Sequence, residues 1–84
     1  MLKTFIVNYI RKLDNKSAKD FALKFGIVFY DYEIELFLPY LQRNGSYLLS
    51  LDNINKKIHE DFDNKINVNS INKLCLLINK LGYN

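Results

Sequence analysis

The chain has 84 residues, a formal net charge of +3 and a hydrophobic content of 49%, which fits one small globular domain spanning residues 1–84. The chain has one cysteine, so it cannot form an intrachain disulfide. This cysteine and the one histidine are too few to supply the ligands of a structural zinc site. No run approaches the roughly 18 apolar residues of a membrane-spanning helix, and polar residues interrupt the apolar N-terminus too early for a signal peptide. The composition therefore favours a soluble cytoplasmic protein, because a single thiol suits a reducing compartment.

Apolar residues recur at helical spacing along nearly the whole chain, which predicts an all-α fold, a compact bundle of about five short helices. The first helix is expected to bury a stripe of Leu2, Phe5, Ile6, Tyr9, Ile10 and Leu13. The second is expected to begin at Ser17, in a capping box with Asp20, and to end at a left-handed Gly26. Residues 27–30 are a short β-prone run without a pairing partner, and we expect a connector that buries Ile27.

The third helix is predicted to start from an N-cap at Asp31, with Glu33 and Glu35 in its first turn, where the helix dipole favours carboxylates. Pro39 is expected to kink or break this helix, because proline lacks a backbone N–H and its ring clashes with the preceding turn. The segment is expected to close at Asn44–Gly45.

The last two helices are expected to begin at polar caps. Ser50 or Asp52 is the predicted N-cap of the fourth helix, and Asn69 or Ser70 that of the fifth, which Gly82 is expected to end. The stripes predicted to be buried are Ile34, Phe37, Leu38 and Leu41 in the third helix, Leu51, Ile54, Ile58 and Phe62 in the fourth, and Ile71, Leu74, Cys75, Ile78 and Leu81 in the fifth.

Basic residues in the first two helices raise one class of function. Residues 1–30 carry six Lys or Arg against two Asp or Glu, and the candidate phosphate contacts are Arg11, Lys12, Lys16, Lys19 and Lys24. The spacing around Gly26 resembles a helix–turn–helix, but the helix that would read bases begins with carboxylates, which phosphates repel. A nucleic-acid-binding regulator using this basic face is therefore the alternative hypothesis. The amphipathic first helix would also suit an anionic membrane surface, but burial of its stripe is favoured and no membrane partner is expected.

Catalytic and metal-binding chemistry has little support. His59 and Asp63 lie four residues apart on one face of a predicted helix, but no second His or Cys completes a metal site. Cys75 lies within an apolar stripe, where a buried thiol is expected to be inert. The three glycines stand alone, so the sequence offers no phosphate-binding loop. We therefore expect no enzyme activity, no cofactor, no metal and no small-molecule substrate.

The aromatic residues suggest the leading hypothesis. Twelve aromatic side chains are more than so small a core can hide, and tyrosine is common in interfaces because it joins a large apolar area to a polar tip. The candidate interface residues lie before and along the third helix: Phe29, Tyr30, Tyr32, Tyr40 and Tyr47. We expect a non-enzymatic module that binds another protein, or itself, through this surface.

The order of several short motifs also bears on identity. They are Ala18-Lys19-Asp20-Phe21-Ala22, Phe25-Gly26-Ile27, Leu41-Gln42-Arg43-Asn44 and Ile71-Asn72-Lys73-Leu74. Together with an amphipathic N-terminal helix, this order resembles the YqfT-like proteins, a small family of low-GC Gram-positive bacteria. The resemblance implies a cytosolic helical protein and assigns no site residues. Pro39 and the acidic start of the third helix depart from the family pattern.

Overall fold

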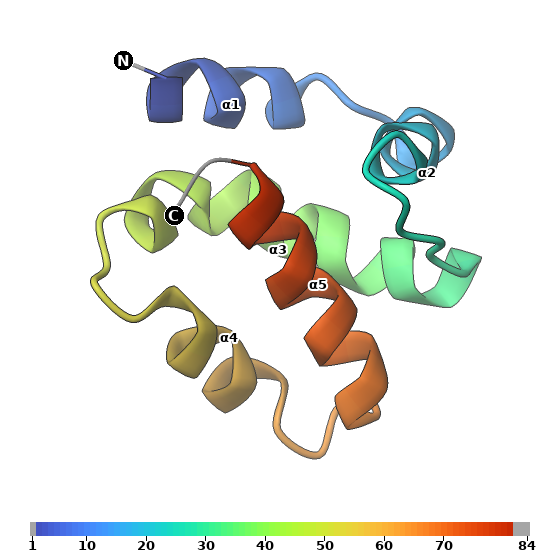
Figure 1. The fold of residues 1–84 in the computed structure, drawn as a ribbon, viewed down its shortest axis with the longest axis vertical. Helices are drawn as coiled ribbons and strands as arrows, with labels where there is room; N and C mark the ends of the chain where they lie inside the picture. Colours follow the sequence, from blue (N-terminus) through green and yellow to red (C-terminus); the bar gives the residue numbers. More distant parts are fainter. Residues whose placement is uncertain (1, 82–84) are drawn as a thin grey trace.

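Five helices make up the fold of residues 2–81, the part of the chain that the computed structural model describes, with side chains described for residues 5–48 and 50–81. They are α1 (Leu2–Arg11), α2 (Asn15–Leu23), α3 (Asp31–Leu49), α4 (Ile54–Phe62) and α5 (Val68–Lys80). Residues 2–81 contain no strand. α1, α2 and α4 pack against α3, and α4 also packs against α5 (Figure 1). The predicted all-α bundle of five helices is confirmed.

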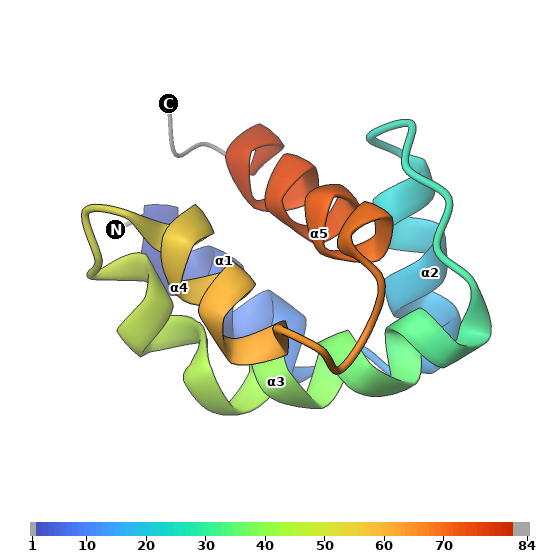
Figure 2. The same cartoon turned by 90° about the horizontal axis from the view of Figure 1, so that it is seen from below.

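The longest helix, α3, lies along one side of the molecule. Figure 2 shows α4, α5 and α2 on one side of α3 and no other helix on the opposite side. Gln42 of α3 also holds the end of α1, because its side-chain amide donates hydrogen bonds to the carbonyl oxygens of Ile10 at 3.2 Å and Leu13 at 3.0 Å. The carbonyl of Ile10 belongs to the last turn of α1, where a helix leaves its acceptors without intrahelical partners, and Leu13 lies two residues beyond the end of α1.

The second helix starts earlier than the sequence pattern predicts. The N-cap of α2 is Asp14, whose carboxylate accepts a hydrogen bond of 2.8 Å from the backbone N–H of Ser17. This bond holds the pKa of Asp14 below its ordinary value. Ser17 as the N-cap is therefore wrong: its N–H is the donor that an N-cap three residues earlier satisfies.

The last two helices show the same kind of shift. Asn53 caps α4 by accepting from the N–H of Lys56 at 3.2 Å, and Asn67 caps α5 by accepting from the N–H of Ser70 at 3.0 Å. The N-caps predicted at residues 50 or 52 and at 69 or 70 are wrong, because an asparagine within three residues of each position provides the bond. The predicted stop at Gly82 lies outside the described residues.

Gly26 ends α2 as predicted. Its φ is +80°, in the left-handed region. The N–H of Gly26 donates to the carbonyl of Leu23 at 2.9 Å and the N–H of Ile27 donates to that of Ala22 at 3.2 Å, the bond pair of a Schellman motif. The chain then continues as an extended connector in which Ile27 is buried, as expected.

The third helix is longer than predicted. Its N-cap is Tyr30 instead of Asp31, and it continues through Pro39 and Gly45 to Leu49, so neither residue ends it. Gly45 is buried, and a methyl group in place of its hydrogen would lie 3.6 Å from the methyl carbons of Val7. Gly45 therefore marks the place where α1 approaches α3 closely and does not act as a stop signal.

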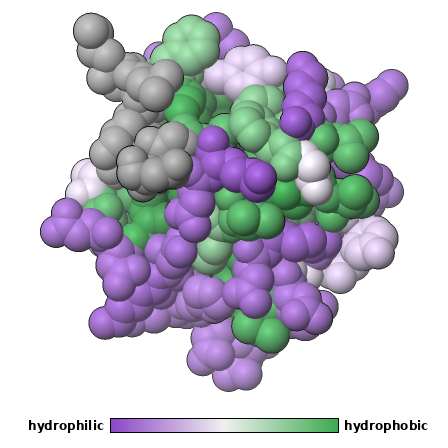
Figure 3. Space-filling view, viewed as in Figure 1, coloured by the Kyte–Doolittle hydropathy of each residue, from purple (hydrophilic) through white to green (hydrophobic). Residues whose placement is uncertain are grey.

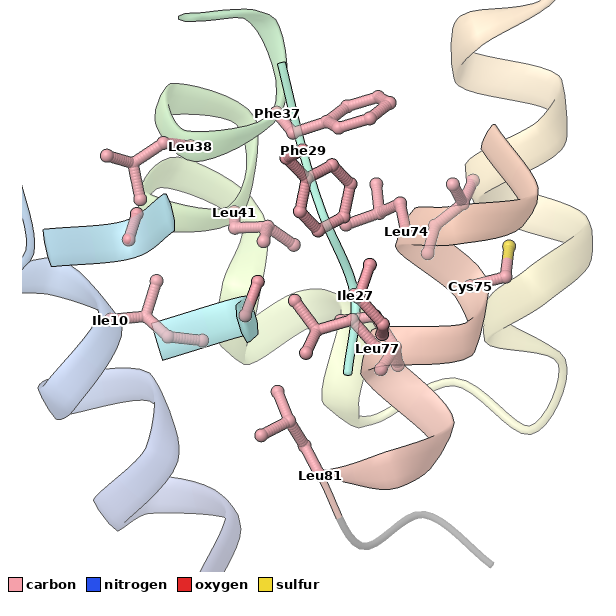
Figure 4. Packing of buried hydrophobic residues seen from close by; sticks show 14 of the residues in the cluster. Ile10, Ile27, Phe29, Phe37, Leu38, Leu41, Leu74, Cys75, Leu77 and Leu81 are labelled. Atoms are coloured by element: carbon pink, nitrogen blue, oxygen red, sulfur yellow. The ribbon is translucent and has the colours of Figure 1, made fainter. Parts of the chain in front are cut away.

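The core is a continuous set of apolar side chains from all five helices and the connector. The rings of Phe29 and Phe37 meet edge to face, with 5.9 Å between their centroids (Figure 4). Phe37 also meets Phe62 edge to face, at 5.0 Å between centroids. The predicted stripes of α3 and α5 are buried, as are Ile54, Ile58 and Phe62 of α4.

The buried face of α1 is rotated from the predicted one. Val7 and Ile10 are buried, whereas Phe5 and Tyr9 are 69% and 40% exposed. The Tyr9 ring lies 5.1 Å from the ring of Phe21 on α2 and so forms part of an outer aromatic contact. The prediction that Phe5 and Tyr9 belong to the buried stripe is wrong, and the side chain of Leu2 lies outside the described set.

Candidate interaction surface

A buried polar cluster fixes the start of α3. Glu33 is only 1% exposed, and its carboxylate accepts three hydrogen bonds. The donors are the Nζ of Lys73 at 2.6 Å, the backbone N–H of Tyr30 at 2.7 Å and the hydroxyl of Ser70. Burial would raise the pKa of Glu33, but the bonds from Lys73, Ser70 and Tyr30 outweigh it, and the pKa lies below its ordinary value. The carboxylate is therefore charged at neutral pH and joins the first turn of α3 to α5.

Lys73 connects this buried cluster to the surface. Its Nζ also donates to the backbone carbonyl of Val28 at 2.9 Å and lies 4.8 Å from the ring centroid of Tyr30 and 5.3 Å from that of Phe29. An ammonium group over an aromatic face is attracted by the ring quadrupole. One side chain on α5 thus holds the connector, the N-cap of α3 and the Tyr30 ring together.

Two exposed tyrosines lie next to the cluster of Glu33, Ser70 and Lys73. Tyr30 and Tyr32 are 60% and 52% exposed, and their rings are stacked, with planes 9° apart and centroids 6.1 Å apart. The backbone of Tyr30 is held by Glu33 and its ring by Lys73. A held aromatic pair loses less side-chain entropy on binding than two freely rotating rings.

The tyrosine pair continues into an exposed line of side chains along α3. We call this line the outer ridge; its members are Tyr32, Leu36, Pro39, Arg43 and Tyr47. Spacings of four, three, four and four residues place them on one helical face, over a length of about 22 Å. All five are exposed, and they lie on the helix that Figure 2 shows with one side free of other helices.

Of the five aromatic residues predicted to form an interface, three are exposed, one is half-buried and one is buried. Tyr30, Tyr32 and Tyr47 are exposed and belong to the outer ridge or lie beside it. Phe29 is only 2% exposed, so the expectation that it contacts a partner is wrong; its ring packs against Phe37 in the core.

Tyr40 is half-buried and is already engaged within the chain. Its hydroxyl donates to Asp61 at 2.6 Å, and its ring packs against Phe62 at 4.6 Å. Tyr40 therefore connects α3 to α4, and its place in a partner interface stays a prediction.

The five residues predicted to contact nucleic acid differ in their exposure and ion pairing. Arg11, Lys12, Lys16 and Lys24 are exposed and form no ion pair with another described residue. Lys19 instead pairs with Asp31 at 2.9 Å across the connector. Four cations of α1 and α2 thus remain on the surface, with Asp14 and Asp20 exposed among them. Figure 3 shows apolar and polar side chains interspersed over α1, α2 and α5.

The polar cluster around His59 borders an open groove of about 620 Å³ between α4 and α5. The polar wall comprises Lys56, His59, Glu60, Asp63 and Asn64, and the apolar floor Ile66, Val68 and Ile71. α4 ends at Phe62, so Asp63 begins a turn and does not share a helical face with His59. Within residues 5–48 and 50–81, no group of three or more His, Cys, Asp or Glu could hold a metal ion.

Cys75 is buried, and burial raises the pKa of its thiol. The core also contains a cavity of about 30 Å³ bounded by side chains of α1, α2, α3 and α5 and lined only by apolar residues. An apolar cavity of this size offers a water no hydrogen-bond partner.

Sequence reasoning did not identify the Glu33 cluster. The sequence shows only a glutamate in the first turn of the third helix. Its partners Ser70 and Lys73 lie 37 and 40 positions further along the chain, and no local pattern links them to Glu33.

Comparison with protein-family models, curated proteins and solved structures finds no match, so the resemblance to the YqfT-like proteins stays a prediction. No helix within residues 2–81 has the length and apolar character needed to cross a membrane.

Proposed function

We propose that this protein is a non-enzymatic interaction module that binds a protein partner through the outer ridge of α3. The observation that carries the proposal is the exposure of Tyr32, Leu36 and Pro39 on one face of the longest helix, beside the stacked Tyr30 ring. Exposed apolar side chains scattered singly need no explanation, whereas a contiguous line indicates an interaction site.

The second support is the rigidity of the surface. The ion pair between Glu33 and Lys73 fixes the start of α3, and Tyr40 and Gln42 attach its middle to α4 and α1. Helix-in-groove and helix-on-helix recognition use anchors at such i, i+4, i+7 positions on a preformed helix. Tyrosine and arginine, which the ridge contains, are frequent among the residues that dominate binding energy.

A matched pair of variants tests the proposal. Leu36 on the outer ridge and Leu76 on α5 are both exposed leucines within helices, 36% and 48% exposed. Wild-type protein, Leu36→Gln and Leu76→Gln are immobilised and used to capture proteins from a lysate of the source cells, with quantification by mass spectrometry. We expect proteins that bind wild type and Leu76→Gln and lose at least tenfold of their signal on Leu36→Gln. An identical set of bound proteins on all three surfaces contradicts the proposal.

The four exposed cations of α1 and α2 support a second candidate, a nucleic-acid-binding regulator. Such binding would appear as fluorescence polarisation of a labelled duplex at about 50 mM salt and would fall steeply as salt rises, because each phosphate contact releases counterions. Lys12→Glu and Lys16→Glu should then weaken binding, while Lys80→Glu on α5 serves as the control. No signal at this salt concentration eliminates the candidate.

A further inference from the structure

We propose that the occupant of the outer ridge is the ridge of a second copy, in an antiparallel homodimer whose twofold axis passes by Pro39. This inference rests on the proposed function, because it names the partner of the same surface. It is carried by the arrangement of charge along α3, which is complementary to itself only when the chain directions are opposed.

The ridge has the spacing of a helix-pairing seam. Tyr32, Leu36, Pro39 and Arg43 follow one another at intervals of four, three and four residues, the spacing at which one helix packs along another. Pro39, the middle member of the ridge, is exposed and donates no backbone hydrogen bond. Its ring is short and apolar, so two such faces can approach closely at their prolines.

Two charged residues of α3 determine the relative direction of the two helices in the dimer. Glu35 lies four residues before Pro39 and Arg43 lies four residues after it, and both are exposed. Neither forms an ion pair with another described residue of its own chain. In an antiparallel pair centred on Pro39, Glu35 of each copy comes opposite the partner's Arg43, so the contact gains two ion pairs.

A parallel pair has the opposite consequence. It would place Glu35 beside the partner's Glu35 and Arg43 beside the partner's Arg43, and like charges repel. The antiparallel arrangement also opposes the two helix dipoles and brings Tyr32 next to the partner's Tyr47, since these residues lie seven and eight positions from Pro39. A twofold interface of this kind closes on itself and leaves no ridge free for further copies.

The contact is one helical face about 22 Å long on each copy, which belongs with the small interfaces that bury less than about 1,200 Å². We therefore expect a reversible dimer with a dissociation constant on the order of 100 μM, an affinity found for transient interfaces. Because the ion pairs lie at the surface, dimerisation should weaken as salt rises from about 50 to 500 mM.

Charge exchange at the two positions tests both the dimer and its direction. Sedimentation equilibrium is measured from about 10 to 500 μM at low salt for wild type, Glu35→Arg, Arg43→Glu and the double variant. Each single variant should weaken dimerisation at least tenfold, since it places like charges opposite each other. The double variant should return to within about threefold of wild type, and an equimolar mixture of the two single variants should also associate.

The control is Glu60→Arg, the same change at an exposed glutamate of α4, which should leave dimerisation unchanged. Circular dichroism verifies that every variant keeps the helical content of wild type. A wild-type protein that stays monomeric at 500 μM overturns the dimer. Single variants without effect, or a double variant as weak as the singles, overturn the antiparallel arrangement.

Failure of this inference can be distinguished from failure of the proposed function. A monomeric chain that still captures other proteins in a Leu36-dependent way keeps the interaction module and excludes self-association. A monomeric chain without Leu36-dependent capture removes both proposals.

Discussion

The Nζ of Lys73 lies 2.6 Å from the carboxylate of Glu33, and this ion pair joins the first turn of α3 to α5. The two partners differ in their access to water: the Glu33 side chain is 1% exposed and that of Lys73 is 28% exposed. Because a buried charge is costly without its partner, the consequence of breaking the pair depends on which partner is removed.

We expect Lys73→Met to lower the free energy of unfolding by about 3 kcal/mol and Glu33→Gln by about 1–2 kcal/mol. The first variant leaves a carboxylate buried, whereas the second leaves an ammonium group that can turn toward solvent. Urea unfolding followed by circular dichroism at pH 7 measures both values. If Glu33→Gln proves the more damaging change, the ion pair does not act in this way.

The same carboxylate predicts a dependence of stability on pH. The pKa of Glu33 is lower in the folded chain than its ordinary value of 4.5, so the unfolded state binds its proton more readily. The stabilisation is therefore fully present above about pH 4.5 and is lost as the pH falls through the folded-state pKa. The stability difference between wild type and Glu33→Gln should shrink as the pH is lowered from 6 to 3. Glu60→Gln, at an exposed position, provides the comparison and should show no such trend.

Much of the fold could be predicted from the sequence because the apolar spacing of α3, α4 and α5 is regular. The buried residues Ile34, Phe37, Ile58 and Leu74 all follow from this spacing. The spacing fails at α1, where Val7, next to the predicted stripe, is also apolar and competes for the buried face. Val7 turns inward and Phe5 outward because Gly45 lets α1 approach α3 at Val7, a tertiary contact that no local pattern reveals.

The candidate site could be predicted only in part, for the same reason. The tyrosine pair follows from composition and position, since Tyr30 and Tyr32 adjoin a helix start. The support beneath it does not, because Glu33 and Lys73 are 40 residues apart and meet only when α5 lies across the start of α3. Phe29 lies between the exposed residues Val28 and Tyr30, but its own ring packs against Phe37 in the core. Tyr40 lies at the edge of the buried stripe of α3, and its bond to Asp61 depends on α4, 21 residues away in the sequence.

Two glycines should respond oppositely to the same substitution. Gly26 has φ +80°, which an L-residue adopts only with strain, so Gly26→Ala should destabilise the protein by about 1 kcal/mol. Gly45 lies within α3, and the added methyl would rest at ordinary contact distance, 3.6 Å, from Val7. Gly45→Ala should therefore stabilise it by about 0.5–1 kcal/mol, because alanine restricts the unfolded chain and favours the helix. Thermal unfolding of both variants beside wild type measures the two signs, and a destabilising Gly45→Ala would mean that α1 cannot accommodate the methyl group.

The hydroxyl of Tyr40 predicts a second effect of pH, in the alkaline range. Burial, followed by the hydrogen bond to Asp61, raises the pKa of Tyr40 above its ordinary value of 10.0. The unfolded chain loses this proton near pH 10 and the folded chain holds it, so the stabilisation is present below pH 10 and is lost as the pH rises toward the folded-state pKa.

Spectrophotometric titration of the folded protein should show one tyrosine that ionises at a higher pH than the others. Tyr40→Phe should remove that late step and lower the free energy of unfolding at pH 7 by about 1–2 kcal/mol, since Asp61 then keeps only Lys57. The control Tyr47→Phe, at an exposed tyrosine of the same helix, should leave the late step in place; a titration in which Tyr40→Phe also keeps it would show that another tyrosine is responsible.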